Sequence, residues 1–141
     1  MKVVLDSNVV LSGFLWSGLC TQFFELANAG VIEPYTSREL LDEINDVLHR
    51  PKHAQNVART GFTAKQLVSQ YQRFAKRIPA QKFTQQICRD ADDDDVLACA
   101  LAAKASMIIT GDKDLLVLHP WRGIHILKPF EALQRLTVSN K

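Results

Sequence analysis

Val3-Val4-Leu5-Asp6 is a short apolar run that ends on an aspartate, and it is the clearest indication of the fold in this sequence. A second run near the other end of the chain, Met107-Ile108-Ile109, reaches Asp112 through Thr110-Gly111. Short aliphatic runs without polar alternation are typical of strands buried on both faces of a parallel sheet. Because open parallel sheets carry their chemistry beyond the carboxyl ends of their strands, the two aspartates predict one acidic site built from both ends of the chain.

Between these runs, helical and extended patterns alternate. We predict strands at residues 2–6, 31–35, 107–110 and 124–127, and a short extended segment at 83–88. We predict helices at residues 9–15, 21–29, 37–49, 63–77, 92–104, 113–118 and 130–136. This alternation indicates an α/β fold with a parallel sheet and helices on both faces. No linker is evident, so residues 1–141 are expected to form a single domain.

Three helix starts carry capping residues. Ser7-Asn8 supplies N-cap chemistry for the helix that follows the first strand. Thr36 with Glu39, and Thr63 with Gln66, have the spacing of a capping box. In the helix after Thr36, Leu40, Leu41, Ile44, Val47 and Leu48 form an apolar stripe at helical spacing.

The charge is unevenly distributed, although the net charge is only +2. Residues 47–89 contain no acid and nine basic residues, a pattern that suits a polyanion such as RNA but also fits a solvated basic helix. The basic residues expected to grip RNA are Arg50, Lys52, Arg73, Lys76 and Arg77.

The composition favours a reduced, cytoplasmic protein without a membrane segment. Cys20, Cys88 and Cys99 form neither an even set nor a Cys-x-x-Cys pair, so we expect free thiols. The first strand begins at Lys2, which leaves no room for a signal peptide, and no apolar stretch approaches the ~20 residues that span a bilayer.

Helical phase selects among the remaining acids. In the helix at 37–49, Glu43 lies about 100° from the centre of the apolar stripe, nearer than any other acid of that helix, so it is the acid best placed to lean over the sheet edge. For Asp6 and Asp112 the structural alternatives are an Asx turn and an N-cap.

The segment Asp90-Ala91-Asp92-Asp93-Asp94-Asp95 holds more acids than helix capping and dipole compensation require. Asp94 stacks with Ala98 and Leu101 on the helix, which makes it the preferred candidate for a metal-related role. The roles of Asp92, Asp93 and Asp95 stay open at this point. Clustered carboxylates favour Mg²⁺ or Mn²⁺ over zinc.

Four motifs in order resemble the PIN domain family, in particular its VapC-like branch of toxins from toxin–antitoxin pairs. They are Val-Val-Leu-Asp6-Ser7-Asn8, Leu-Leu-Asp-Glu43-Ile, Cys-Arg-Asp-Ala-Asp-Asp-Asp94, and Ile-Thr110-Gly-Asp112-Lys-Asp114-Leu. The resemblance spans residues 2–133 and implies a three-layer α/β/α sandwich. It assigns the metal and catalytic quartet to Asp6, Glu43, Asp94 and Asp112, with Asn8, Thr110 and Asp114 as supporting residues. Ala91 departs from the family pattern, which commonly has proline there.

The resemblance implies a Mg²⁺- or Mn²⁺-dependent endoribonuclease that cleaves single-stranded or structured RNA, with an antitoxin protein as partner and a homodimer as assembly. Two other functions compete with it. A binding module with this fold would hold RNA or protein without cleavage. A receiver-type phosphoacceptor also uses clustered aspartates and Mg²⁺, but it needs an aspartate after a central mid-chain strand, which this sequence lacks.

Overall fold

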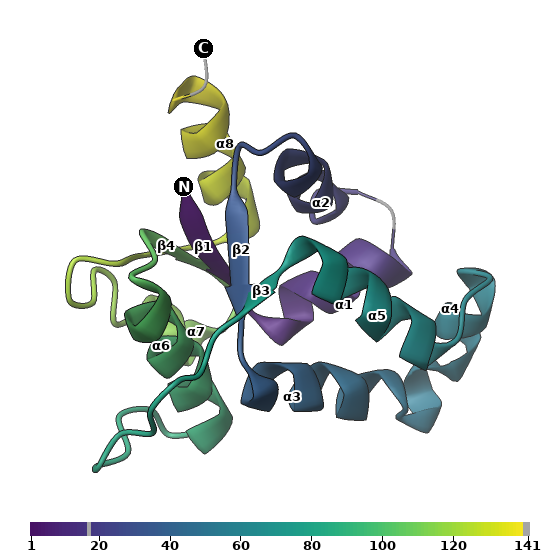
Figure 1. Ribbon diagram of the computed structural model, residues 1–141, viewed down its shortest axis with the longest axis horizontal. Helices are drawn as coiled ribbons and strands as arrows, with labels where there is room; N and C mark the ends of the chain where they lie inside the picture. The colour runs from purple at the N-terminus through teal and green to yellow at the C-terminus, as the bar shows by residue number, and fades with distance from the viewer. Residues whose placement is uncertain (17, 140–141) are drawn as a thin grey trace.

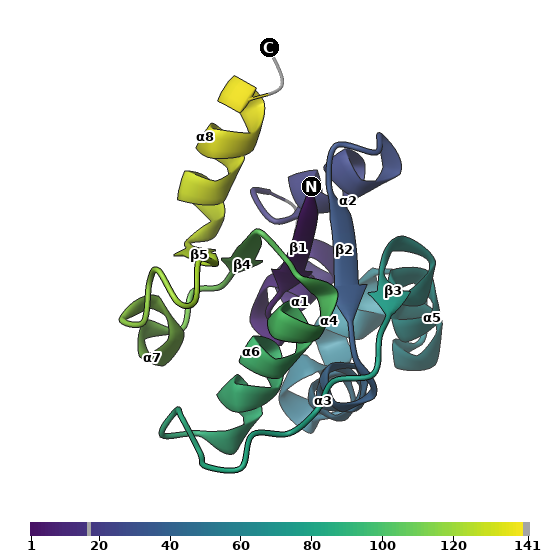
Figure 2. The same cartoon turned by 60° about the vertical axis from the view of Figure 1, so that its left-hand side comes forward.

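The computed structural model describes residues 1–16 and 18–139 and contains a five-stranded sheet in which all strands are parallel (Figure 1, Figure 2). The strand order is β3-β2-β1-β4-β5, so the N-terminal strand lies at the centre. The strands are β1 (Lys2–Leu5), β2 (Glu33–Thr36), β3 (Lys76–Arg77), β4 (Met107–Ile109) and β5 (His125–Leu127).

Helices cover both faces of the sheet and complete a three-layer α/β/α sandwich, which confirms the predicted fold class (Figure 2). The helices are α1 (Ser7–Leu15), α2 (Thr21–Asn28), α3 (Arg38–Leu48), α4 (Ala54–Arg59), α5 (Ala64–Phe74), α6 (Ala91–Ala103), α7 (Lys113–Leu116) and α8 (Pro129–Ser139), with a 3₁₀ turn η1 (Pro51–His53) before α4.

Alternate residues of the central strand feed two separate cores. Val3 and Leu5 pack with residues of α1, α2, α3, α5 and α8 on one face. Val4 packs on the other face, mainly with α6 and α7. All three side chains are at most 2% exposed. Burial on both faces explains why the strand has no polar alternation.

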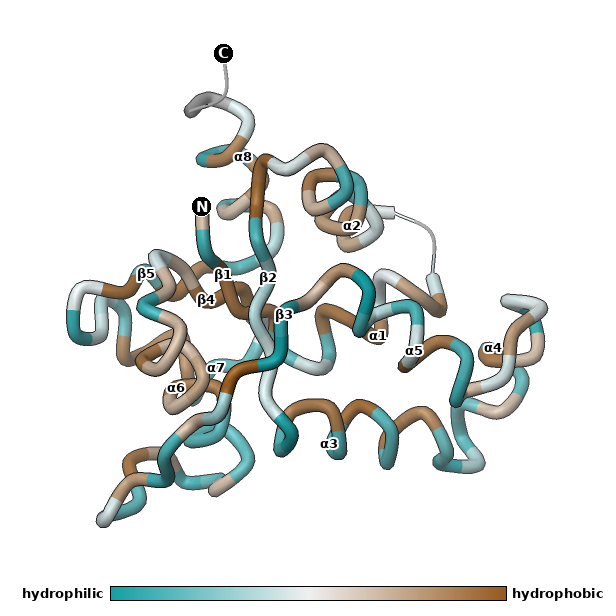
Figure 3. Tube along the Cα trace, in the orientation of Figure 1, coloured by the Kyte–Doolittle hydropathy of each residue, from teal (hydrophilic) through white to brown (hydrophobic). Residues whose placement is uncertain are grey.

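Helix α3 begins later than predicted. Its N-cap is Ser37, whose Oγ accepts the backbone N–H of Leu40 at 3.3 Å. The predicted capping box of Thr36 with Glu39 is therefore wrong, because Thr36 is the last residue of β2. The predicted apolar stripe is buried, and Figure 3 shows the alternation of apolar and polar residues along this helix.

Helix α5 has the predicted start and an earlier end. Thr63 and Gln66 form the capping box, with both of its hydrogen bonds present. The helix ends at Phe74 rather than at residue 77, because Lys76–Arg77 pairs with β2 and becomes the edge strand β3. This strand extends the sheet on the side away from β4.

Two other segments differ from the sequence prediction. Residues 51–59 form η1 and α4, which lack an apolar stripe long enough to predict them. Residues 83–88 form no strand, and the backbone groups of Ile87 and Cys88 bond to the side chains of Gln86 and Asp94. Within the described residues, Cys20, Cys88 and Cys99 are free thiols. Across 1–16 and 18–139, no helix is both long and apolar enough to cross a membrane.

Candidate metal centre

The carboxyl ends of β1 and β4 lie side by side, and each is followed by a polar segment. The backbone N–H of Asp6 donates to the Ile109 carbonyl at 3.0 Å. The buried Thr110 hydroxyl donates to Asp6 Oδ2 at 2.6 Å and accepts the backbone N–H of Asp112 at 3.0 Å. A single hydroxyl therefore links the two strand-ending segments that the sequence places at opposite ends of the chain.

Both aspartates also begin helices. Asp6 is the N-cap of α1, and its Oδ1 accepts the Ser7 backbone N–H at 2.8 Å. The predicted N-cap at Ser7-Asn8 is therefore displaced by one residue, and Asn8 is exposed in the first turn of α1. Asp112 caps α7 through the backbone N–H of Asp114 at 2.8 Å. The helix N-termini partly compensate the two negative charges.

Asp93 completes a carboxylate cluster at this edge. One oxygen each from Asp93, Asp112 and Asp114 lie within 4.8 Å of one another. Asp93 is only 7% exposed, and its Oδ2 is buried without a hydrogen-bond partner among the described residues. Desolvation, together with the charges of Asp112 and Asp6, raises the pKa of Asp93 to about 7. We call Asp93, Asp112 and Asp114 the acidic cluster.

Asp6 interacts with Asp112 of the acidic cluster through its charge, and Glu43 in turn interacts with Asp6. Desolvation and the charges of Asp6, Asp92 and Asp90 raise the pKa of Glu43 to about 7, although a hydrogen bond with Ser7 opposes the shift. Desolvation likewise raises the pKa of Asp6. The charge interaction of Glu43 with Asp6 places Glu43 near the carboxyl end of β1, as predicted from its position relative to the apolar stripe of the helix.

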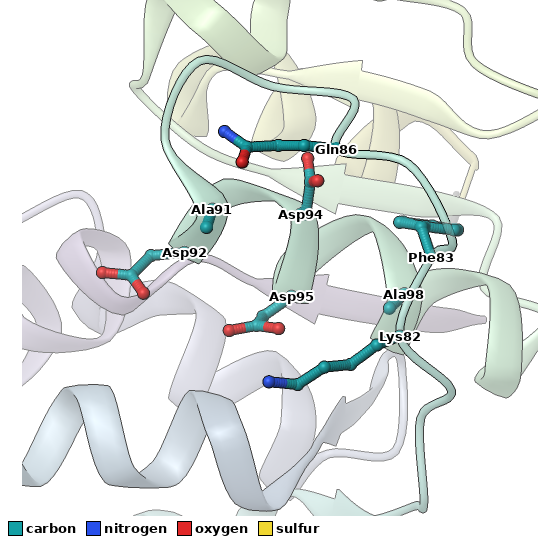
Figure 4. A pocket seen from close by; sticks show the side chains of 8 residues that line it. All are labelled: Lys82, Phe83, Gln86, Ala91, Asp92, Asp94, Asp95 and Ala98. Atoms are coloured by element: carbon teal, nitrogen blue, oxygen red, sulfur yellow. The ribbon is translucent and has the colours of Figure 1, made fainter.

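Among the described residues, Asp112 is the one member of the predicted quartet that belongs to the acidic cluster. Asp6 interacts with Asp112, and Glu43 with Asp6, whereas Asp94 is held by the preceding loop. Its Oδ2 accepts the Ile87 backbone N–H at 2.8 Å, and its Oδ1 accepts that of Cys88 at 2.7 Å. Desolvation acts in the opposite direction, but these two hydrogen bonds lower the pKa of Asp94. Figure 4 shows its carboxylate turned toward the Gln86 segment of the preceding loop.

Packing of α6 explains why Asp93 rather than Asp94 faces the cluster. Asp93 shares its face with Leu97 and Ala100, which are fully buried against the sheet. Asp94 shares the face of Ala98, which lines a cavity of about 270 Å³ between α6 and residues 82–86. The body of α6 is apolar all round, so the sequence offered no single stripe from which to choose between the two acids. Knowing that Leu97 and Ala100 are buried would have identified Asp93 as the acid on the inward face of α6.

The other acids of this segment have separate surroundings. Asp90 is the N-cap of α6, and its Oδ1 accepts the Asp92 backbone N–H at 3.0 Å. Asp92 is exposed. Asp95 lines the cavity and points toward Lys82 (Figure 4). Asp90 thus has the helix-capping role that the sequence predicted for some of the acids of this segment.

The donor set fits a hard divalent cation. The acidic cluster offers carboxylate oxygens, which are the ligands that Mg²⁺ and Mn²⁺ prefer. The unpartnered Oδ2 of Asp93 is a second indication, because a buried carboxylate oxygen without a donor is costly unless a cation compensates it. Asp6 and Glu43 add negative charge at the border of the same site.

The metal-free protein is expected to lose stability as the pH rises from about 5.5 to about 8. Glu43 and Asp93 have pKa values of about 7 in the fold, against 4.5 and 3.8 as ordinary values, so the native state binds more protons in this range. Their contribution to stability is present at the lower pH and is lost as the pH passes through about 7. After discounting for solvent screening, we expect a loss of about 1–2 kcal/mol.

Thermal unfolding in EDTA at both pH values tests this expectation, and added Mn²⁺ should restore stability at the higher pH. Glu43→Gln should flatten the pH dependence, whereas Asp42→Asn, at an exposed position of the same helix, should not. A Tm that stays constant or rises with pH in EDTA contradicts the expectation.

The basic residues predicted to grip RNA flank the site rather than surround it. Arg77 ends β3 at the same sheet edge, two strand spacings or about 10 Å from β1. Arg50 lies two residues beyond the end of α3, and its Nη2 pairs with Asp46 Oδ2 at 3.1 Å. Lys52 lies on η1, Arg73 on α5 and Lys76 on β3, where Lys76 pairs with Glu33. Arg89, the last residue of the basic stretch, lies at the acidic cluster itself, with Nη2 3.6 Å from Asp114 Oδ1.

Comparisons with known proteins identify the family of the chain. The sequence profile described as PIN domain matches residues 2–114, which include the acidic cluster. A relative described as an uncharacterized protein of Methanocaldococcus jannaschii is 33% identical over 119 residues, covering 84% of this chain and 75% of that protein. The crystal structure of VapBC2 from Rickettsia felis, bound to a DNA fragment from their promoter, matches in fold with a TM-score of 0.60 and 13% identity, over 91% of this chain and 98% of that chain. The chain therefore belongs to the PIN domain family.

Proposed function

We propose that this single-domain protein is a metal-dependent endoribonuclease. The observation that carries the proposal is the convergence of Asp93, Asp112 and Asp114 within 4.8 Å, beside a buried carboxylate oxygen without a donor. Membership of the PIN domain family supports a nuclease. The basic, acid-free stretch of residues 47–89, which ends at Arg89 beside Asp114, supports a polyanionic substrate, because RNA backbone is gripped by lysine and arginine.

Each side chain of the site has a proposed task. Asp93, Asp112 and Asp114 would hold Mg²⁺ or Mn²⁺, with Asp6 and Glu43 completing the negative environment. When bound, such an ion supplies activation of water and neutralisation of charge on the phosphate. Glu43, with a pKa of about 7, is poised to accept the proton of the attacking water at its carboxylate.

The remaining polar residues position these groups. Thr110 holds Asp6 and the Asp112 backbone in register through its hydroxyl. Asn8, exposed in the first turn of α1, presents an amide to a phosphate or sugar of the substrate. In this proposal Asp94 is not a metal ligand, although the resemblance to the PIN domain family places it in the metal and catalytic quartet.

The flanking basic residues would hold single-stranded or structured RNA without reading its sequence. They are Arg50, Lys52, Arg73, Lys76 and Arg77. Arg77, about 10 Å from β1 at the carboxyl end of the sheet, matches a substrate that extends beyond the scissile phosphate.

We also propose a small antitoxin protein as partner and a homodimer as assembly. The likeness in fold to a structure of VapBC2, which is described as bound to promoter DNA, supports the antitoxin partner. The homodimer is what the resemblance to the family implies. An adjacent reading frame whose small product blocks RNA cleavage when added to the purified protein would support the toxin role.

The proposed function is tested with a fluorescein-labelled single-stranded RNA and a DNA of the same sequence. We expect the purified protein to cleave the RNA internally with Mn²⁺ or Mg²⁺, and to stop when EDTA is in excess. Equal cleavage in EDTA would contradict the metal-dependent mechanism. Tight, salt-sensitive RNA binding with no cleavage under any divalent ion would instead favour an RNA-binding module.

A further inference from the structure

The last residues of the loop that leads into α6 are held by hydrogen bonds with the side chains of Gln86 and Asp94. Asp94 accepts the backbone N–H groups of Ile87 and Cys88 with its two carboxylate oxygens, at 2.8 and 2.7 Å. Gln86 Nε2 donates to the carbonyls of Cys88 at 2.7 Å and Arg89 at 2.9 Å. These four hydrogen bonds fix a segment that has no helix or strand of its own.

A carboxylate can accept two backbone N–H groups at once, one on each oxygen, and hydrogen bonds of this kind are among the strong ones in proteins. The buried Cys88 side chain adds a second attachment, since it packs in the same core as α6. Both oxygens of Asp94 are therefore engaged in holding the loop.

The residue that this loop delivers to the site is Arg89. Its guanidinium lies 3.6 Å from Asp114 of the acidic cluster, yet its side chain is 87% exposed. It thus stands at the border between the cluster and solvent, where a substrate would approach. A guanidinium offers a planar fork of donors that matches a phosphate group.

We infer that Arg89 contacts an RNA phosphate at the metal centre and that Asp94 is the positioning residue that holds it there through residues 87–88. The inference rests on the proposed function for its substrate. A cation in the acidic cluster would neutralise Asp114, so the exposed guanidinium is free to pair with the phosphate. Asp94 then acts on cleavage through the loop and not through the metal.

The positioning role is tested first without RNA, by amide hydrogen exchange and Mn²⁺ binding. Asp94→Ala should speed exchange of the Ile87 and Cys88 amides by about tenfold or more, because it removes their acceptor. Its Mn²⁺ affinity should stay within about threefold of wild type, well short of the 10- to 100-fold loss typical of altered metal sites. Asp94→Asn, which keeps one acceptor oxygen, should be intermediate in exchange. Asp95→Asn is the matched control on the same helix and should change neither quantity.

Unchanged exchange of both amides in Asp94→Ala would overturn the positioning role. A loss of Mn²⁺ binding equal to that of Asp93→Asn would also overturn it and make Asp94 a ligand. Neither readout requires RNA cleavage, and the amide-exchange result is independent of the proposed function.

The role of Arg89 is tested by steady-state kinetics on the labelled RNA. Arg89→Ala should raise KM about tenfold with a smaller change in kcat, and should reduce the salt dependence of RNA binding by about one counterion. Asp94→Ala should shift KM in the same direction. The double variant should be no worse than Arg89→Ala, because both changes remove the same contact.

Additive effects in the double variant, or an unchanged KM in Arg89→Ala, would overturn the inference. RNA affinity is measured in parallel by fluorescence anisotropy. If the wild type binds RNA without cutting it, the proposed function fails, while the effect of Arg89→Ala on affinity still decides the role of Arg89.

Discussion

Asp93→Asn is expected to lower the rate of RNA cleavage at least about 100-fold while leaving the fold intact. The substitution replaces a charged oxygen of the acidic cluster with a neutral amide, so the cluster holds a divalent cation less well. It also removes the repulsion of Asp93 by Asp112 and Asp6, which helps to raise the pKa of Asp93 to about 7. The metal-free variant should therefore unfold at the same temperature as wild type or higher.

Initial cleavage rates at saturating Mn²⁺ and thermal unfolding in EDTA measure the two expectations. Asp95→Asn provides the control, since it removes one charge from the same helix at a position that faces Lys82. Wild-type cleavage by Asp93→Asn would contradict the assignment. So would a larger loss of cleavage in Asp95→Asn than in Asp93→Asn.

Thr110→Val is expected to cost about 1–3 kcal/mol of stability and about 10- to 100-fold in cleavage. The threonine is fully buried, and valine has nearly the same shape. The change leaves Asp6 Oδ2 without its donor and the Asp112 N–H without its acceptor. Because the Thr110 hydrogen bond lowers the pKa of Asp6, its loss should raise that pKa further.

Urea unfolding and cleavage rates compare this variant with Thr110→Ser, which keeps the hydroxyl and removes only a methyl group. Serine should retain most of the activity, although it loses some packing. Equal losses for valine and serine would mean that the methyl group matters and the hydroxyl does not, contrary to the link between the two strand ends.

Much of the fold follows from local sequence patterns. The apolar runs of β1 and β4 predicted buried parallel strands, because a strand covered on both faces needs no polar residues. Thr63 and Gln66 predicted the start of α5, since capping depends on a few neighbouring residues. The end of α5 was not predictable from local pattern. Lys76–Arg77 continues the helical pattern in the sequence but pairs with β2, a strand that is distant in the chain.

The candidate site was predicted in part for the same reason. Asp6 and Asp112 follow strands whose adjacency is a property of the parallel sheet, so their meeting could be expected from the sequence. Asp93 and Asp94 are adjacent on a helix that is apolar all round, and only the packing of Leu97 and Ala100 against the sheet decides which of them faces inward. Arg89 depends on the path of an irregular loop, which no local pattern specifies.

The most direct test is an anomalous difference map from crystals of the protein soaked in Mn²⁺. We predict a peak among the carboxylates of Asp93, Asp112 and Asp114, with Asp94 still bound to the Ile87 and Cys88 amides. A Mn²⁺ peak held by Asp94, or no peak in the acidic cluster at a saturating concentration, would contradict the metal centre described above.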